Sequence, residues 1–198
     1  MSREKLDPQN MYKSIFDFPD QIEKAVEIGK NIGLRKPYSK VNKIVLAGMG
    51  GSAVGGDLLS LALRNHVSVP FFVSRNYTLP NWVDEKSLVI CSSYSGNTEE
   101  TLSAFNEARS KNATVIGITT GGVLSSWLKE YDCDEITIVD GLQPRAAVGY
   151  SMIPMMFLIK KILEIELNLD FILDETKNEL LEKRNTYSIM NSQNPVYS

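Results

Sequence analysis

Short apolar runs alternate with amphipathic stretches through the middle of the chain. Apolar runs bounded by glycine or polar turn residues are typical of buried strands. The sequence predicts five such strands: Lys43–Ala47, Pro70–Val73, Ser87–Cys91, Thr114–Ile118 and Glu135–Val139. Strands that alternate with helices predict a parallel sheet covered by helices on both faces. The expected fold class is therefore α/β, a three-layer α/β/α domain with a five-stranded parallel sheet.

Apolar residues recur at helical spacing between and outside these runs. Phe18-Pro19 divides the N-terminal stretch 11–33 into two predicted helices, because proline interrupts a helix. Pro154 lies inside a long apolar stretch and predicts a kink or a restart there. Further helices are expected after the first strand up to Leu63, over Asn97–Ser110, around Leu124–Leu128, over about Ala147–Leu167 and over about Asp174–Tyr187.

The stretch Cys91–Glu100 carries the clearest chemical signal. It leads from a buried strand into a helix, and Asn97 with Glu100 resembles a capping box, which places the helix N-terminus at this turn. The free N–H groups and partial positive charge of a helix N-terminus favour an anion. The stretch therefore predicts a phosphate site that also uses three hydroxyls, those of Ser93, Ser95 and Thr98. The alternative is a capped turn with ordinary polar residues.

A glycine-rich loop follows the first strand. Its sequence, Gly48–Ala53, matches the G-x-G-x-x-A fingerprint of dinucleotide-binding folds. However, Ser74 and Arg75 stand where a Rossmann NAD site has an acidic residue. Since Arg75 is compatible with an NADP phosphate, a small NADP-dependent oxidoreductase is one alternative.

The same loop has a second interpretation, which depends on the order of the strands. In a flavodoxin-like doubly wound sheet of order 2-1-3-4-5, the first and third strands are neighbours at the switch point, where ligands bind. Gly51 and Ser52 would then face Ser93, Ser95 and Thr98 across one crevice. Two short polar loops fit a single phosphate with a sugar-sized body better than a long dinucleotide.

Composition and charge narrow the choice of partners. A formal net charge of −3 without a basic block argues against nucleic acid. The sequence has no charged-then-apolar leader, and its longest apolar stretch, Met152–Ile159, is too short to span a bilayer. Cys91 and Cys133 have neither metal-ligand spacing nor a CxxC arrangement. No metal site and no membrane are therefore expected, and a reduced, cytoplasmic protein is the default.

Three motifs together carry a resemblance to a known family. They are Gly-Met-Gly-Gly-Ser-Ala-Val-Gly-Gly-Asp at 48–57, Ser-Tyr-Ser-Gly-Asn-Thr-Glu-Glu-Thr at 93–101 and Gly-Leu-Gln-Pro-Arg-Ala-Ala-Val-Gly-Tyr at 141–150. The chain resembles the bifunctional phosphoglucose/phosphomannose isomerases, which are sugar isomerase (SIS) domain enzymes, from about Tyr12 to Leu167. The Ser-x-Ser-Gly-x-Thr pattern alone indicates only an SIS domain, and the third motif narrows the resemblance to these isomerases.

The resemblance implies an activity and a site. It implies that glucose 6-phosphate or mannose 6-phosphate is interconverted with fructose 6-phosphate, and no cofactor is expected for this reaction. Arg145 would stabilise the enediolate intermediate, since a fixed guanidinium can hold developing oxyanion charge. The substrate phosphate would be held by Gly51, Ser52, Ser93, Ser95 and Thr98.

The resemblance covers only half of such an enzyme. Members of the family have a second SIS domain, which carries the proton-shuttling glutamate and the ring-opening histidine. The sequence ends at residue 198, and its only histidine, His66, matches no family motif. We therefore expect N-terminal helices over 1–40, an SIS domain over 41–168 and, over 169–198, a helix and linker toward a missing second SIS domain. The chain alone is expected to lack the catalytic base.

Two alternatives stay open beside the isomerase. One is a non-catalytic SIS module that binds a sugar phosphate, and the other is the NADP-dependent oxidoreductase. The expected partners are a small-molecule sugar phosphate and a second copy of the chain. Apolar surface or the N-terminal helices would drive formation of this homodimer.

Overall fold

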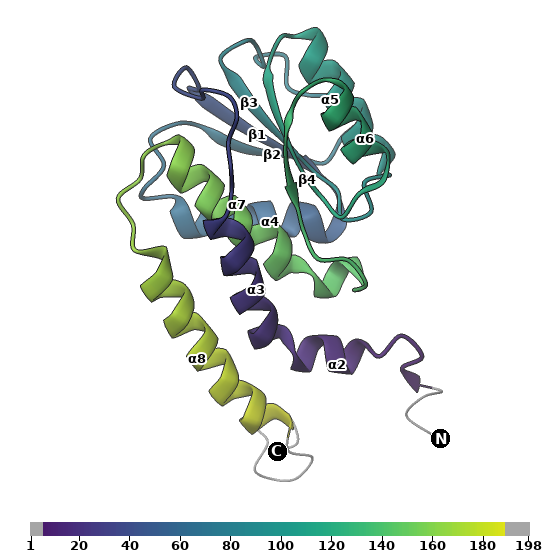
Figure 1. The fold of residues 1–198 in the computed structure, drawn as a ribbon, viewed down its shortest axis with the longest axis vertical. Coiled ribbons are helices and arrows are strands. Elements are labelled where there is room, and N and C mark those ends of the chain that lie inside the picture. Colours follow the sequence, from purple (N-terminus) through teal and green to yellow (C-terminus); the bar gives the residue numbers. More distant parts are fainter. Residues whose placement is uncertain (1–5, 189–198) are drawn as a thin grey trace.

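A parallel sheet of five strands forms the centre of the molecule (Figure 1). The structure, a computed structural model, describes residues 6–188. The strands lie in the order β2-β1-β3-β4-β5, which confirms the predicted 2-1-3-4-5 arrangement. Their bounds differ from the predicted ones by at most two residues: β1 Lys43–Gly48, β2 Phe71–Ser74, β3 Ser87–Ser92, β4 Thr114–Thr119 and β5 Asp134–Thr137.

Helices connect the strands and cover the sheet. They are α2 Met11–Phe16, α3 Phe18–Lys30, α4 Gly50–Leu63, α5 Glu99–Ser110, α6 Gly122–Glu130, α7 Val148–Ile162 and α8 Leu169–Ser188, with a 3₁₀ turn, η1, at Pro144–Ala146. Helix α7 continues through Pro154, so the predicted restart does not occur. No helix within residues 6–188 is long and apolar enough to cross a membrane.

The two largest differences from the predicted helix boundaries occur where local caps decide the helix end. Helix α7 ends before Leu167, since Glu164 is left-handed (φ 52°) and the N–H of Ile165 donates to the carbonyl of Lys160 (3.0 Å). Helix α8 begins well before Asp174, because Asn168 Oδ1 accepts the N–H of Phe171 at 3.2 Å. The part of the predicted helix and linker over 169–198 that follows Ser188 lies outside the described residues.

Alternate residues of the central strands enter two separate cores. In β1, Ile44 and Leu46 pack with α3, α4 and α7 on one face of the sheet. Val45 and Ala47 pack with α5 and α6 on the other face. These residues are almost fully buried on both faces, which confirms the three-layer α/β/α architecture.

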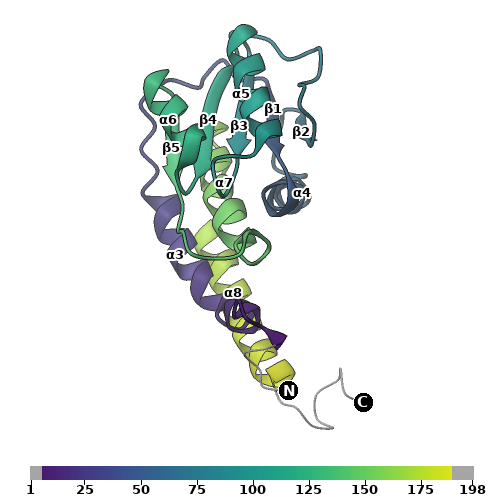
Figure 2. The same cartoon turned by 90° about the vertical axis from the view of Figure 1, so that its right-hand side faces the viewer.

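Helices α3 and α8 pack side by side and extend beyond the sheet (Figure 2). Three ion pairs connect them: Lys30–Asp170, Glu23–Lys177 and Asp20–Arg184. Exposed ion pairs contribute at most about 1 kcal/mol each. The buried side chains of Leu169 and Leu173 therefore hold α8 in place more firmly than the charges do.

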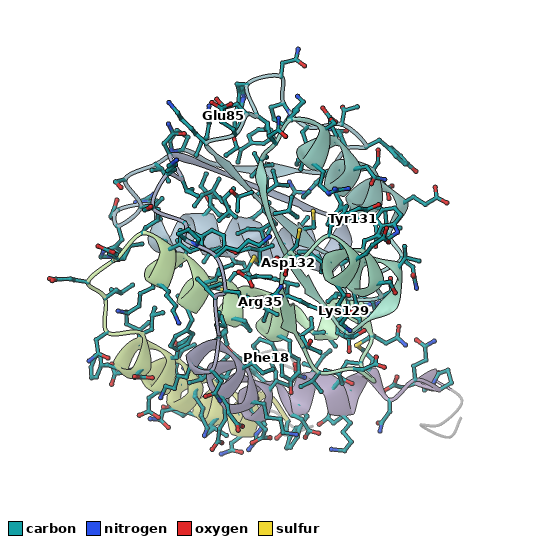
Figure 3. All side chains as sticks on the ribbon, turned by 45° about the horizontal axis from the view of Figure 1, so that its top comes forward. Phe18, Arg35, Glu85, Lys129, Tyr131 and Asp132 are labelled. Atoms are coloured by element: carbon teal, nitrogen blue, oxygen red, sulfur yellow. The ribbon has the colours of Figure 1, made fainter. Side chains whose placement is uncertain are left out.

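The segment before β1 is anchored at the start of β5. Asp134 is only 2% exposed and accepts hydrogen bonds from the Tyr38 hydroxyl (2.5 Å) and from Arg35 Nε (2.9 Å). Arg35 also pairs with Asp132, and Figure 3 shows these two side chains next to each other. Burial raises the pKa of Asp134, but the hydrogen bonds from Tyr38 and Arg35 outweigh burial and lower the pKa overall. An ionised carboxylate thus fixes this segment at the amino end of the strand.

Candidate functional site

Gly48 and Ser92 bring the two predicted loops together. They are paired neighbours at the carboxyl ends of β1 and β3. A Cβ added at Gly48 would lie 2.8 Å from the Ser92 carbonyl oxygen, so glycine allows the strand ends to approach closely. The glycine loop after β1 and the serine loop after β3 therefore start side by side at one edge of the sheet, as the switch-point rule predicts.

The serine loop, residues 93–98, holds two of its hydroxyls in one hydrogen bond. Ser93 Oγ lies 2.8 Å from Thr98 Oγ1, and Ser93 is buried. Because one hydroxyl donates to the other, one O–H proton of the pair remains available for a ligand. Ser95 is exposed and accepts the N–H of Asn97 (3.2 Å), which leaves its own proton free to donate. The loop thus presents the hydrogen-bond donors that an anion requires.

Helix α5 has Thr98 as its N-cap residue, so the predicted capping box of Asn97 and Glu100 is wrong. Thr98 has extended dihedral angles (φ −69°, ψ 116°), and the helix begins at Glu99. Asn97 contacts a different helix, since its Oδ1 accepts the N–H of Val123 in the first turn of α6 at 3.0 Å. No side chain caps the N-terminus of α5, and its first N–H groups therefore remain available to a ligand.

The loop after β4 packs against the serine loop and forms hydrogen bonds to it. Gly96 has a φ of 69°, and a Cβ there would lie 1.8 Å from the Gly121 carbonyl oxygen. Thr120 donates both its N–H and its hydroxyl to the Tyr94 carbonyl, at 3.1 and 2.8 Å. Apolar spacing does not predict these contacts. The Gly121-Gly122 pair, one residue beyond the end of β4, was the signal that could have indicated a tightly packed loop.

The glycine loop packs against the segment that carries Arg145. A Cβ at Gly51, in the first turn of α4, would lie 2.6 Å from the Pro144 carbonyl oxygen and 3.6 Å from Arg145 Cα. Ser52 follows Gly51 and is buried. The three sequence motifs therefore meet at the same edge of the sheet.

Arg145 lies in the 3₁₀ turn η1 and is exposed. The turn is closed by a hydrogen bond of 2.8 Å from the N–H of Ala146 to the carbonyl of Gln143. Among the described residues, no carboxylate forms an ion pair with the Arg145 guanidinium. The guanidinium is therefore available for an anionic group of a ligand.

Other charged groups near the loops are engaged with each other. Arg75, on which the NADP alternative depends, forms an ion pair with Asp57 of α4. Tyr77 donates its hydroxyl to Glu99, in the first turn of α5, at 3.2 Å. Its pKa is raised, mainly by the nearby charge of Glu100 and also by burial and by Glu99.

The histidine and the two cysteines differ in their exposure. His66 is exposed just after α4. Cys91 is buried, which raises the pKa of its thiol, and Cys133 is half-buried. Within residues 6–188, no group of three or more His, Cys, Asp or Glu residues could hold a metal ion.

The chain is similar to sugar-phosphate isomerases. The model of the SIS domain family matches residues 38–162. A bifunctional phosphoglucose/phosphomannose isomerase from Caldicellulosiruptor bescii is 48% identical over 177 residues, which are 89% of this chain and 52% of that protein. A protein of the same name from Thermoplasma volcanium is 39% identical over 156 residues, 78% of this chain and 49% of that protein. The chain spans about half the length of these curated relatives.

A solved structure agrees at the level of the fold. The C-terminal domain of glucosamine-fructose-6-phosphate aminotransferase from Francisella tularensis matches with a TM-score of 0.63 and 18% identity. The match covers 90% of this chain and 55% of that chain. At such low identity the likeness concerns the arrangement of the helices and strands only.

Proposed function

The chain belongs to the SIS domain family, and from this premise we propose that it is the phosphate-binding half of an aldose–ketose isomerase. The proposed reaction interconverts glucose 6-phosphate or mannose 6-phosphate with fructose 6-phosphate. The meeting of the serine loop, the glycine loop and the Arg145 turn at one edge of the sheet is the observation that carries this proposal. The names of the curated relatives support the substrate class.

The proposed phosphate site consists of Gly51, Ser52, Ser93, Ser95 and Thr98. A phosphate dianion only accepts hydrogen bonds, so every group that binds it must donate. Ser95 and the Ser93–Thr98 pair supply O–H donors, and the uncapped N-terminus of α5 supplies N–H donors and partial positive charge. Hydrogen bonds to a charged group contribute roughly 1.5–3 kcal/mol each.

Arg145 is proposed to stabilise the enediolate. Exchange between an aldose and a ketose removes a proton from one carbon and returns it to the neighbouring carbon, and the enediolate formed in between carries negative charge on its oxygens. A guanidinium held beside these oxygens stabilises this charge more strongly in the transition state than in the ground state. The η1 turn and the close contact of Pro144 with Gly51 fix the backbone that presents Arg145.

The general base is proposed to come from the part of the relatives that this chain does not span. The glutamates beside the serine loop, Glu99 and Glu100, lie in the first turn of α5, and Glu99 accepts the Tyr77 hydroxyl. The proposed division is N-terminal helices over 1–40, an SIS domain over 41–168 and, over 169–198, a segment leading to a second SIS domain. The 198-residue chain should then bind the substrate but isomerise it poorly.

Calorimetric titration and an isomerase assay test this function together. Fructose 6-phosphate should bind, and NADPH should not. The double variant Ser95→Ala with Thr98→Ala should lose most of the affinity for fructose 6-phosphate. Because a positioned general base contributes about 10²–10⁴ in rate, turnover by the 198-residue chain should fall far below about 1–10³ s⁻¹. A polypeptide that supplies the second SIS domain should restore turnover.

The other possible results of the titration and the isomerase assay each point to a different conclusion. If wild-type protein binds no fructose 6-phosphate, or the double variant binds it equally well, the phosphate site is wrong. Full turnover by the chain alone would place the base within it. Binding without turnover, even when the second domain is present, would favour a non-catalytic module that binds sugar phosphates.

A homodimer is proposed to form through α2 and the end of α8. Ile15 and Tyr12 are 63% and 46% exposed and border an apolar groove of about 470 Å³. Leu180 and Tyr187 of α8 and Arg145 of η1 also line the groove, so a second copy seated there would lie beside Arg145. A second copy of the chain would cover this surface. Sedimentation of wild-type protein should show a dimer and that of Ile15→Asp a monomer, whereas a monomeric wild type would refute the proposal.

A reduced, cytoplasmic setting is also proposed. Cys91 and Cys133 are both free thiols, and free thiols persist in reducing compartments. Fractionation of the source cells should recover the protein with the cytoplasmic enzymes.

A further inference from the structure

We propose that Tyr94 is a positioning residue that couples the phosphate site to Arg145. This proposal rests on the proposed function. Tyr94 lies between Ser93 and Ser95, the two serines proposed to hold the phosphate. Its hydroxyl, however, reaches a different segment and accepts the N–H of Leu142 at 2.9 Å. Leu142 stands three residues before Arg145.

Hydrogen bonds fix the backbone of the serine loop at Tyr94. Its carbonyl accepts two hydrogen bonds from Thr120, at 3.1 and 2.8 Å. The N–H of the preceding residue, Ser93, donates to the carbonyl of Ile118 in β4 at 3.0 Å. The ring is partly buried and packs against the core, as Leu142 does. A side chain fixed in this way can transmit the position of the serine loop to the residue that it contacts.

The segment that carries Arg145 is held by its backbone. The Tyr94 hydroxyl holds it at Leu142, and close packing against Gly51 holds it at Pro144. The Arg145 side chain itself forms no ion pair with a described residue. The buried Ala146 and Ala147 hold the segment on the C-terminal side of Arg145. On the N-terminal side it is held at Leu142 and Pro144, so loss of the Tyr94 contact would loosen the segment there.

This coupling matters because the substrate is held at one end and reacts at the other. The phosphate of a hexose 6-phosphate is on C6, whereas the proton moves between C1 and C2. An enzyme for this reaction must fix the distance between its phosphate site and the group that stabilises the enediolate. Tyr94 stands between two serines of the phosphate site and contacts the segment that carries Arg145, so it sets that distance.

Binding of two probes to the Tyr94→Phe variant tests the coupling. Inorganic phosphate occupies the phosphate site only, whereas an aldonohydroxamate 5-phosphate also presents an enediolate-like group to Arg145. Tyr94→Phe should change the affinity for inorganic phosphate by less than about twofold and lower that for the hydroxamate about fivefold to tenfold. Arg145→Ala should also lower the affinity for the hydroxamate, and adding Tyr94→Phe to Arg145→Ala should lower that affinity no further.

A matched control separates positioning from a general loss of stability. Tyr38→Phe removes a buried hydrogen-bonding hydroxyl at the amino end of β5. This variant should melt at a lower temperature than wild-type protein but bind both probes with unchanged affinity. Hydrogen exchange should become faster over residues 141–146 in Tyr94→Phe and remain unchanged over residues 93–98.

Other outcomes would overturn the proposal. If Tyr94→Phe lowers the affinity for both probes equally, Tyr94 only shapes the phosphate site. If Tyr94→Phe lowers the affinity for the hydroxamate further in the Arg145→Ala background, Tyr94 acts independently of Arg145. If Tyr94→Phe does not fold, exchange in wild-type protein decides, because a Leu142 amide that exchanges as fast as an exposed one refutes the hydrogen bond. If wild-type protein binds neither probe, the proposed function fails and the coupling fails with it. If wild-type protein binds both probes but Tyr94→Phe does not lower the affinity for the hydroxamate more than that for inorganic phosphate, the coupling alone fails.

Discussion

The hydroxyl oxygens of Ser93 and Thr98 lie 2.8 Å apart and close the loop that joins β3 to α5. Ser93 is buried directly after the strand, and Thr98 is the N-cap residue of the helix. The hydrogen bond therefore joins the two ends of the serine loop. It also leaves one of the two hydroxyl protons to be donated to a ligand.

Replacing Thr98 should weaken the binding of sugar phosphate. Thr98→Ala removes a hydroxyl donor and the partner of Ser93, so the affinity for fructose 6-phosphate should fall about tenfold or more. Thr98→Ser keeps the hydroxyl and should bind within about threefold of wild-type protein. Because the two hydroxyls act as a pair, Ser93→Ala should lower the affinity for fructose 6-phosphate less in the Thr98→Ala background than in wild-type protein. Unchanged affinity of Thr98→Ala in a calorimetric titration would contradict this prediction.

Replacing Gly96 should disrupt the serine loop. Alanine at this position would have a left-handed backbone (φ 69°) and a Cβ 1.8 Å from the Gly121 carbonyl oxygen. The free energy of unfolding should fall by at least about 2 kcal/mol, measured by denaturant titration. Gly33→Ala is the matched control, since a Cβ at Gly33 meets nothing within 4 Å. Equal stability of the two variants would refute the packing of the two loops.

Replacing Asn97 should affect α6 rather than α5. Asn97→Ala removes the acceptor for the Val123 N–H and should cost about 0.5–2 kcal/mol, as the loss of a helix cap does. Amide exchange should become faster in the first turn of α6. Faster exchange in the first turn of α5 instead would support the capping box that the structure excludes.

The anchor at Asp134 should make stability depend on pH in the acid range. Its pKa is lowered in the folded state, so its contribution is complete above the ordinary carboxyl pKa of about 4 and is lost as the pH falls below that value. At pH 7, Asp134→Asn should cost about 2–3 kcal/mol of unfolding free energy. The difference from wild-type protein should shrink below about pH 4.

Asp132→Asn provides the control for this anchor. Asp132 pairs with the same arginine, Arg35, but its side chain is 72% exposed. Its loss should cost at most about 1 kcal/mol. An Asp134→Asn variant that shows the same small loss at every pH would contradict the role of the buried carboxylate.

The strands and their order could be predicted because each signal is local or general. Ile44 and Leu46 alternate with Val45 and Ala47, and a strand that is apolar at every position is buried on both faces. Strands that alternate with helices then restrict the sheet to a few topologies. The adjacency of the loops after β1 and β3 followed from that order alone.

Capping and helix ends could not be predicted in the same way, because several partners compete for one polar side chain. Asn97 and Glu100 have the spacing of a capping box, yet the N–H of Val123 lies within reach of Asn97 once α6 is in place. Similarly, Tyr38 lies in the segment before β1, and only folding brings the distant Asp134 to its hydroxyl.

The amino-acid sequence therefore contains the fold class, the order of the strands and the residues proposed to bind phosphate, since periodicity and motifs need no knowledge of distant contacts. The coupling of Tyr94 to Leu142 exists only in the tertiary structure. These residues are 48 positions apart, and no spacing rule links an aromatic hydroxyl to one backbone N–H among the many that folding could bring near it.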